Sequence, residues 1–159
     1  MSRESLEKAL PVGERLLLDT TTLIAYLSFG EQVSPVSAYI IDEMVRSGRN
    51  PAVVSAVTAM ELLVRPLHIG AVDVSRRIMD FLTSFPNLQS LNVDLQIAQE
   101  AAFLRATLNL RSPDALIIAA GLTRSATHLV TNAAEWQRKL VTHSERVNVC
   151  YLESHLPFL

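Results

Sequence analysis

The first expected strand contains a continuous apolar run, Leu16-Leu17-Leu18, and along the chain short β-branched strand segments alternate with helical ones. A strand that is buried on both faces is apolar throughout rather than alternating, and parallel strands need crossover helices between them. The pattern therefore predicts an α/β fold, a three-layer α/β/α sandwich around a parallel sheet of about five strands. The expected strands are 15–20, 51–55, 88–93, 128–131 and 146–152.

Capping and helix-breaking residues set the expected helix ends. Pro35 suits the first turn of one helix, and Pro66 is expected to end another helix near Arg65. Ser112 and Pro113 form a helix start, in which a capping hydroxyl precedes a proline in the first turn. The other expected helices cover 21–29, 72–83, 94–110, 114–123 and 133–140.

The size and composition of the chain favour one folded unit. With 159 residues, 49% hydrophobic and 19% charged, we expect a single domain over residues 1–159 with its core at about 15–152. The single cysteine excludes an internal disulfide. Residues 1–7 lack the basic start of a signal peptide, and no apolar stretch reaches the roughly 18–20 residues of a spanning helix. We therefore expect a cytoplasmic protein without membrane contact.

Charge and loop motifs argue against two classes of protein. A net charge of −2 is not typical of proteins that grip a phosphate backbone through their whole surface. The chain also lacks the Gly-x-Gly-x-x-Gly and Gly-Lys-Ser/Thr loops of nucleotide-binding α/β proteins.

Three acids stand in apolar surroundings. Asp19 ends the first expected strand, Glu61 lies on the helix after the second, and Asp114 starts the most apolar helix. Ligands of open α/β sheets bind outside the carboxyl ends of the strands, and a carboxylate in apolar surroundings is costly unless it is paired or bound to metal. Simpler interpretations remain open. Asp19 can cap a helix, Glu61 can face solvent, and Asp114 can simply complement a helix dipole.

A shared pocket for these three carboxylates would need a cation or protons. Each like-charged pair costs about 4 kcal/mol at roughly 4 Å and an effective dielectric near 20. Oxygen ligands without a set of Cys or His favour Mg²⁺ or Mn²⁺ over zinc. Divalent metal on carboxylates is the usual machinery of phosphodiester hydrolysis, so a metal-dependent nuclease is the favoured hypothesis.

At these acids the sequence resembles the PIN-domain family, specifically the VapC-like toxin ribonucleases of toxin–antitoxin systems. Four segments carry the resemblance in order and span about residues 15–152: LLDTTTLIAYL at 17–27, SAVTAMELL at 55–63, SPDALIIAA at 112–120 and LVTNAAEW at 129–136. The resemblance implies a Mg²⁺- or Mn²⁺-dependent endoribonuclease that cleaves RNA. It further implies the toxin of a type II pair, often a homodimer, which a cognate antitoxin neutralises.

The resemblance also assigns roles to residues. It implies that Asp19, Glu61 and Asp114 are the catalytic, metal-binding acids, and that the hydroxyl of Thr20 or of a neighbour supports them.

One position departs from the pattern of the family. Family members commonly carry a further acid two residues after Thr131, where this chain has Ala133. Glu135 can substitute from one helical step further on, or Asn132 can hold a water. The departure leaves full activity and the number of metals open.

The sequence gives weaker evidence of a functional role for three other residues. Arg65 and Arg111 adjoin the acidic motifs and are candidates for RNA phosphate contacts, with ordinary surface arginines as the simpler interpretation. Trp136 is interpreted as a core residue rather than a platform for base stacking.

The alternative to the enzyme hypothesis is a catalytically weakened or inactive PIN-fold module that binds RNA or a protein. Ala133 and the net charge favour this alternative.

Overall fold

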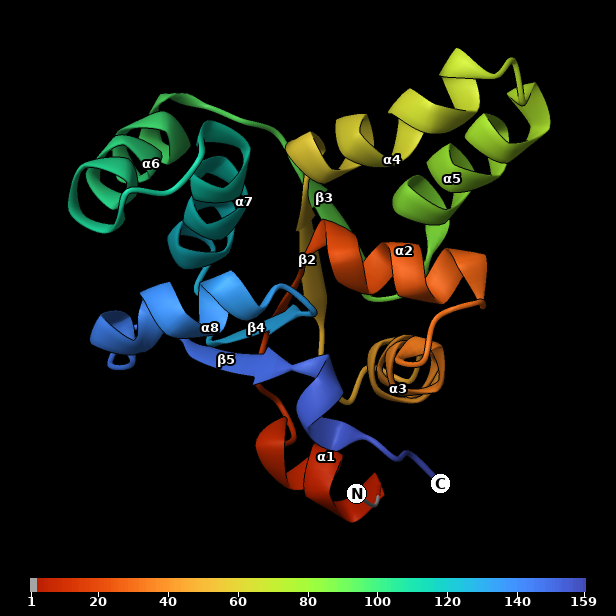
Figure 1. Ribbon diagram of the computed structural model, residues 1–159, viewed down its shortest axis with the longest axis horizontal. Helices are drawn as coiled ribbons and strands as arrows, with labels where there is room; N and C mark the ends of the chain where they lie inside the picture. Colours follow the sequence, from red (N-terminus) through yellow and green to blue (C-terminus); the bar gives the residue numbers. More distant parts are fainter. Residues whose placement is uncertain (1–2) are drawn as a thin grey trace.

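The computed structural model describes residues 3–159 and places a five-stranded sheet at the centre of the molecule (Figure 1). The order β3-β2-β1-β4-β5 puts β1 in the middle, and all neighbouring strands are parallel. The predicted parallel sheet of five strands is therefore confirmed. The strands are β1 (Leu16–Leu18), β2 (Ala52–Ser55), β3 (Leu88–Leu91), β4 (His128–Thr131) and β5 (Asn148–Tyr151).

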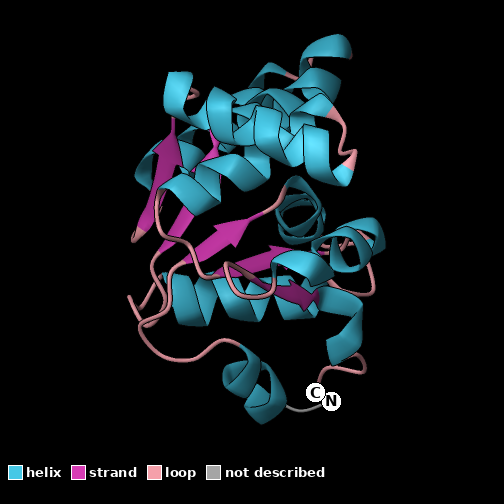
Figure 2. Ribbon diagram, turned by 90° about the vertical axis from the view of Figure 1, so that its left-hand side faces the viewer, coloured by secondary structure: helices cyan, strands magenta, loops and turns pink. Residues whose placement is uncertain are grey.

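Helices cover both faces of the sheet, as the views in Figures 1 and 2 show. The first half of the chain supplies α1 (Arg3–Ala9), α2 (Thr20–Ser28), α3 (Ser34–Ala38), the π-helix η1 (Tyr39–Val45), α4 (Ala56–His68) and α5 (Val72–Ser84). The second half supplies α6 (Leu95–Leu108), α7 (Ser112–Thr123), α8 (Ala134–Lys139) and the 3₁₀ turns η2 (Leu140–His143) and η3 (Leu152–His155). The three-layer α/β/α architecture is confirmed.

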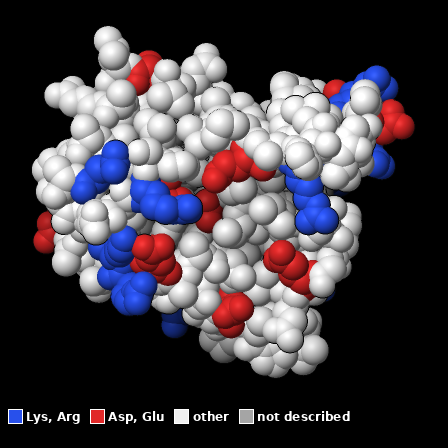
Figure 3. All heavy atoms as spheres, turned by 45° about the horizontal axis from the view of Figure 1, so that its top comes forward, with Lys and Arg blue, Asp and Glu red and all other residues white. Residues whose placement is uncertain are grey.

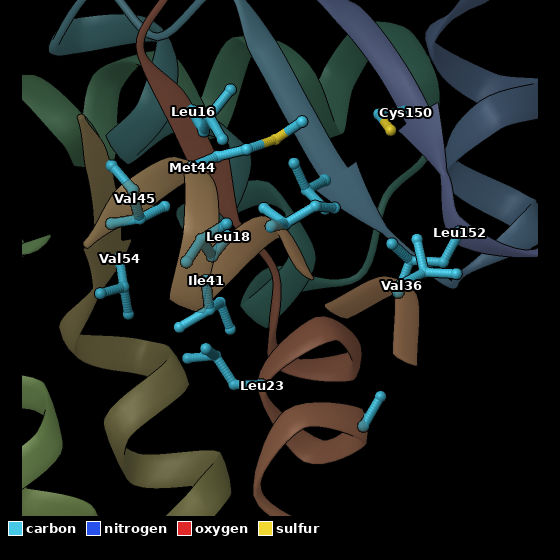
Figure 4. Packing of buried hydrophobic residues seen from close by; sticks show 14 of the residues in the cluster. Leu16, Leu18, Leu23, Val36, Ile41, Met44, Val45, Val54, Cys150 and Leu152 are labelled. Carbon is cyan, nitrogen blue, oxygen red and sulfur yellow. The ribbon is translucent and has the colours of Figure 1, made fainter. Parts of the chain in front are cut away.

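The pleat of β1 divides its apolar residues between two core clusters. Leu16 and Leu18 belong to the cluster under α2, α3 and η1, which Figure 4 shows from close by. Leu17 belongs to the cluster under α6 and α7. Because successive side chains point to opposite faces, a run of three leucines serves both layers at once. Trp136 is 2% exposed in the second cluster, in agreement with its interpretation as a core residue.

The N-terminal segment differs from the sequence prediction. Residues 3–9 form a helix, and Leu6 and Leu10 are fully buried in the first cluster. The buried core therefore begins upstream of residue 15. A helix of seven residues is too short to show a clear apolar stripe, so its burial depends on the partner surface rather than on its own periodicity.

Helix α4 continues past Pro66 to His68, so the prediction that it ends near Arg65 was wrong. Proline removes one amide donor, but its carbonyl and its neighbour's still accept hydrogen bonds. The Ile69 amide donates to the Arg65 oxygen at 3.1 Å, and the Ala71 amide donates to the Pro66 oxygen at 2.8 Å. Near a helix end, where few later donors are lost, a buried proline is tolerated.

Two further local predictions need correction. The helix that starts around Pro35 does not run evenly to Ser47, because α3 passes into the π-helix η1, whose wider turn the apolar spacing does not reveal. Ser112 lies inside α7 rather than at its cap, since Arg111 is the N-cap and has no capping side-chain bond. Among residues 3–159, no helix combines the length and the apolar character that crossing a bilayer requires.

The sheet order creates a topological switch point beside β1. The chain moves from β1 to β2 and β3 on one side, and β4 and β5 fill the other side. Crossovers on the two sides of β1 leave in opposite directions, which opens a crevice at the carboxyl ends of β1 and β4. Asp19 follows β1 directly, and Thr131 ends β4. The fold therefore places both residues at the position where open α/β sheets bind ligands.

Helix α7 lies against β1 at Gly121, which generates a prediction about stability. A Cβ atom at this position would stand 2.6 Å from Cδ2 and 3.0 Å from Cβ of the buried Leu17. We expect Gly121→Ala to destabilise the fold by about 1–3 kcal/mol through overpacking, which a lower melting temperature would report. Gly30→Ala is the matched control, because only the Ser28 oxygen at 3.8 Å lies near its Cβ position. Equal melting temperatures for both variants would contradict this packing account.

Candidate functional site

Asp19 is the buried centre of the site. Its side chain is capped by three donors: the Thr20 amide at 2.7 Å from Oδ1, and the hydroxyls of Thr21 (2.8 Å) and Thr131 (2.7 Å) on Oδ2. The first of these bonds makes Asp19 the N-cap of α2, as the simpler interpretation of this residue required. The Thr21 bond is local to the start of α2, and the Thr131 bond joins the ends of β1 and β4. Capping and site formation are therefore combined in one carboxylate.

The loop after β4 sets the direction of both hydroxyl protons. The Asn132 amide donates to the Thr21 oxygen at 2.8 Å, and the Ala133 amide donates to the Thr131 oxygen at 3.0 Å. A hydroxyl that accepts from a backbone amide still has its own proton to donate. Thr21 and Thr131 therefore present their protons to Asp19.

Burial dominates the electrostatics of Asp19. The residue is 3% exposed, and desolvation raises the pKa of its carboxyl above the ordinary 3.8. The hydrogen bonds from Thr131, Thr21 and the Thr20 amide oppose this rise, and the charge of Asp114 adds to it. A nearby positive charge would favour the ionised form of Asp19.

Glu61 is held to the same centre by Thr20. The Thr20 hydroxyl donates to Glu61 Oε1 at 2.6 Å and lies 3.0 Å from the hydroxyl of the fully buried Thr58. Thr20 therefore connects Asp19, through its amide, with Glu61, through its side chain. A positioning hydroxyl at Thr20 agrees with its expected supporting role.

Asp114 reaches the site from the first turn of α7 and is paired with Arg111. Arg111 Nε lies 3.2 Å from Asp114 Oδ2, and Nη2 lies 3.5 Å from Oδ1. The side chain of Asp114 is 10% exposed and that of Arg111 is 73% exposed, so the arginine covers a largely buried carboxylate from the solvent side. Asp114 acts electrostatically on Asp19, which places the two acids in one neighbourhood.

The three acids surround one region without forming a closed ligand set. Within residues 3–159, no three or more His, Cys, Asp or Glu side chains stand close enough together to hold a metal ion. The donor chemistry nevertheless fits a hard divalent cation, because carboxylates and hydroxyls of Asp19, α2 and α4 meet at the end of β1. Asp114 of α7 acts on Asp19 through its charge, and burial disfavours the ionised form of Asp19. The shared metal site of Asp19, Glu61 and Asp114 stays a prediction.

The position of the additional family acid has no carboxylate here. Ala133 contributes only its amide, to Thr131. Glu135 is paired with Lys139 at 2.7 Å on α8, and this ammonium lowers the pKa of Glu135. Asn132 Oδ1 is buried without a hydrogen-bond partner in the described part of the chain. Replacement of the missing acid by Glu135 or by a water on Asn132 stays a prediction.

Some of the basic side chains lie beside the acids. On the face that Figure 3 brings forward, blue groups gather among red ones at the left, and further blue groups lie at the right. One cluster is built around the turn between α6 and α7, where Lys139 donates to the Asn109 oxygen at 3.0 Å and Arg105 to the Leu110 oxygen at 3.1 Å. Arg65 instead lines a groove with Glu61.

This groove has a volume of about 510 Å³ and lies between α2, α4 and α5. Apart from Ser28, Glu61 and Arg65, its lining is apolar: Ile24, Leu27, Leu62, Pro66, Val74 and Ile78. The groove opens beside one of the predicted catalytic acids.

Sequence reasoning did not single out Thr21 and Thr58, whose hydroxyls complete the network. The run Thr20-Thr21-Thr22 after a strand-ending acid is the signal that was present. Thr58 carried no separate signal, because its contact with Thr20 arises only when α2 and α4 pack together.

The chain matches the model of one protein family. The model of the PIN domain family matches residues 16–139, which include all three acids. A comparison with curated proteins finds no match.

Solved structures of toxin–antitoxin complexes share the fold. A VapBC-1 structure from nontypeable Haemophilus influenzae is 18% identical with a TM-score of 0.64, and the match covers 87% of this chain and 98% of that chain. VapBC2 from Rickettsia felis bound to a promoter DNA fragment gives 15% identity and a TM-score of 0.63, over 86% and 98% of the two chains. A toxin–antitoxin complex from Klebsiella pneumoniae gives 21% identity and a TM-score of 0.61, over 87% and 97%. At these identities the likeness shows the fold.

The burial of Asp19 predicts a pH-dependent effect on stability. Since its folded pKa is raised above 3.8, the ionised form disfavours folding, and the contribution of the protonated carboxyl is lost as the pH rises through the folded pKa. In chelator, we expect Asp19→Asn to gain stability relative to the wild type as the pH rises from about 4 to about 7. Urea unfolding at a series of pH values measures this difference.

Asp80→Asn, which alters an exposed acid on α5, is the matched control and should show no such trend. A wild type that becomes more stable relative to Asp19→Asn over the same range would contradict the raised pKa.

Proposed function

The chain belongs to the PIN domain family, and we propose that it is a divalent-metal-dependent endoribonuclease and the toxin of a toxin–antitoxin pair. PIN domains are generally nucleases. The observation that carries the proposal is the hydroxyl network that links Asp19 to Glu61 through Thr20 at the switch point of the sheet. Desolvation raises the pKa of the Asp19 carboxyl despite its three donors, and an acid with a perturbed pKa in a crevice favours a functional role.

Threonine hydroxyls orient two of the three acids of the proposed site. Asp19, Glu61 and Asp114 would hold Mg²⁺ or Mn²⁺. A divalent cation at this place would supply a water of lowered pKa and stabilise charge on the leaving oxygen of the phosphodiester. Thr20 fixes the direction of Glu61, and Thr21 and Thr131 fix Asp19.

Two arginines are proposed to bind the RNA phosphates. Arg65 lies on α4 in the groove beside Glu61, and Arg111 lies at the start of α7 beside Asp114. Guanidinium groups suit phosphate because their planar fork donates two hydrogen bonds at once. Binding through such a local set is compatible with a net charge of −2.

A second function has its own support. Within residues 3–159, no three acids stand close enough together to hold a metal ion, and position 133 carries an alanine instead of the additional acid. A PIN-fold module that binds RNA or a protein without cutting would share the fold and the groove.

Cleavage assays separate the two functions. We expect RNA cleavage in Mg²⁺ or Mn²⁺ to fall at least about 100-fold in Asp19→Asn and Asp114→Asn, since even outer-shell partners of metal ligands contribute about 10–100-fold. Thr20→Val, which keeps the shape but not the hydroxyl, should lose about 10–100-fold. Asp80→Asn is the control of matched chemistry. Binding of RNA in chelator, with no cleavage by the wild type at any metal concentration, would favour the binding module instead.

The proposed partner is a cognate antitoxin, and the groove between α2, α4 and α5 is its proposed docking place. The solved relatives named above are toxin–antitoxin complexes. Two apolar side chains that line the groove are exposed, Ile24 (41%) and Val74 (38%). An amphipathic segment of a partner would bury them, and an occupant of the groove would lie next to Glu61.

Binding to the product of a short neighbouring reading frame tests this partner. We expect Val74→Asp, which places a charge in the groove lining, to weaken the complex about tenfold or more. Phe103→Asp on α6 is the matched control, because Phe103 is exposed but lies outside the groove. Equal weakening by both substitutions would contradict the docking place. A homodimer and a cytoplasmic location also stay predictions, which light scattering and cell fractionation would check.

A further inference from the structure

The carboxylate of Asp114 already has a cation in front of it. Both of its oxygens face the guanidinium of Arg111, at 3.2 Å and 3.5 Å. Since the Asp114 side chain is only 10% exposed, few of its lone pairs are free to reach another ligand while this pair persists.

The charge of Arg111 also acts on acids from other elements. Besides Asp114 on α7, the neighbours that act electrostatically on this guanidinium are Glu135 on α8 and Glu61 on α4. One positive group therefore offsets three carboxylates that would otherwise repel each other. At two of these acids, Asp114 and Glu61, this is the electrostatic task that a divalent cation would perform.

The side chain of Arg111 is able to leave while its backbone stays. The residue is the N-cap of α7, with extended backbone angles, and its carbonyl accepts from the Ala115 amide at 3.0 Å. The side chain is 73% exposed. An ion pair with one exposed partner is weak enough to exchange, since surface pairs contribute little.

We propose that Arg111 is an internal counter-ion that competes with the divalent metal for Asp114, and that metal binding releases its guanidinium toward the RNA phosphate. The inference rests on the proposed nuclease function and adds a positioning role at its site. One side chain would then have two opposite effects, weakening metal binding and strengthening RNA binding. The Arg111 guanidinium would then be available to bind RNA when the metal site is occupied.

The test measures Mn²⁺ binding and RNA cleavage on the full chain. By electron paramagnetic resonance of free Mn²⁺, we expect Arg111→Gln to bind Mn²⁺ about two- to fivefold more tightly than the wild type, the size that a half-exposed ion pair supports. Arg111→Lys keeps the charge but loses the fork, so its affinity should lie between the two. At saturating Mn²⁺, Arg111→Gln should raise KM for RNA while kcat changes little.

Arg77→Gln on α5 makes the same change of charge at an exposed position and should leave Mn²⁺ affinity unchanged. Equal or weaker Mn²⁺ binding by Arg111→Gln, with a wild type that binds metal and cuts RNA, would overturn the role of Arg111 and leave the nuclease function standing. No Mn²⁺ binding by any variant would overturn both. Tighter metal binding without a rise in KM would overturn the release toward RNA.

Discussion

A carboxylate buried at the carboxyl end of the central strand is the constraint around which this structure is arranged. Asp19 is 3% exposed, and its burial is tolerated because the start of α2 supplies two hydrogen-bond donors to it and the end of β4 supplies a third. The Thr131 donor depends on the register of β1 and β4, which pairs Leu18 with Val130 and so brings Asp19 and Thr131 to the same edge. Loss of that register would leave an unpaired charge in the core, which is far more costly than loss of a surface contact.

The same constraint explains how the acids are arranged. Thr20 draws Glu61 toward the centre, whereas Asp114 is turned to Arg111 and acts on Asp19 only through its charge. Carboxylates in one crevice repel each other, so they are separated or paired unless a cation joins them. A site of this kind needs little net positive charge, because the groups that would contact phosphate stand beside the acids. An acidic protein with a few well-placed arginines is therefore compatible with a substrate that is itself an anion.

Most of the fold could be predicted because the relevant signals are local. Continuous apolar runs such as Leu16–Leu18 require cover on both faces, and that requirement leads to parallel strands and crossover helices. The exceptions are two helices. Helix α1 is stable because Leu6 and Leu10 are buried in the core. Helix α4 continues past Pro66 because the amides of Ile69 and Ala71 still donate hydrogen bonds to carbonyl oxygens. The core surface that covers α1 lies outside its own stretch of sequence, whereas the hydrogen bonds that follow Pro66 are local.

For the proposed site, the sequence by itself determined the candidate residues: three acids in apolar surroundings, a threonine after the first, and an alanine where the resemblance implies an acid. It also determined that the acids follow strands or start helices, because that order is local. The pairs Glu135–Lys139 and Arg111–Asp114 are local to their helices. Only the tertiary structure decided the distant contacts, in which Thr131 joins Asp19 and Thr58 joins Thr20. The reason is physical: a hydrogen bond across roughly a hundred residues depends on strand order and helix packing, and these are properties of the whole chain.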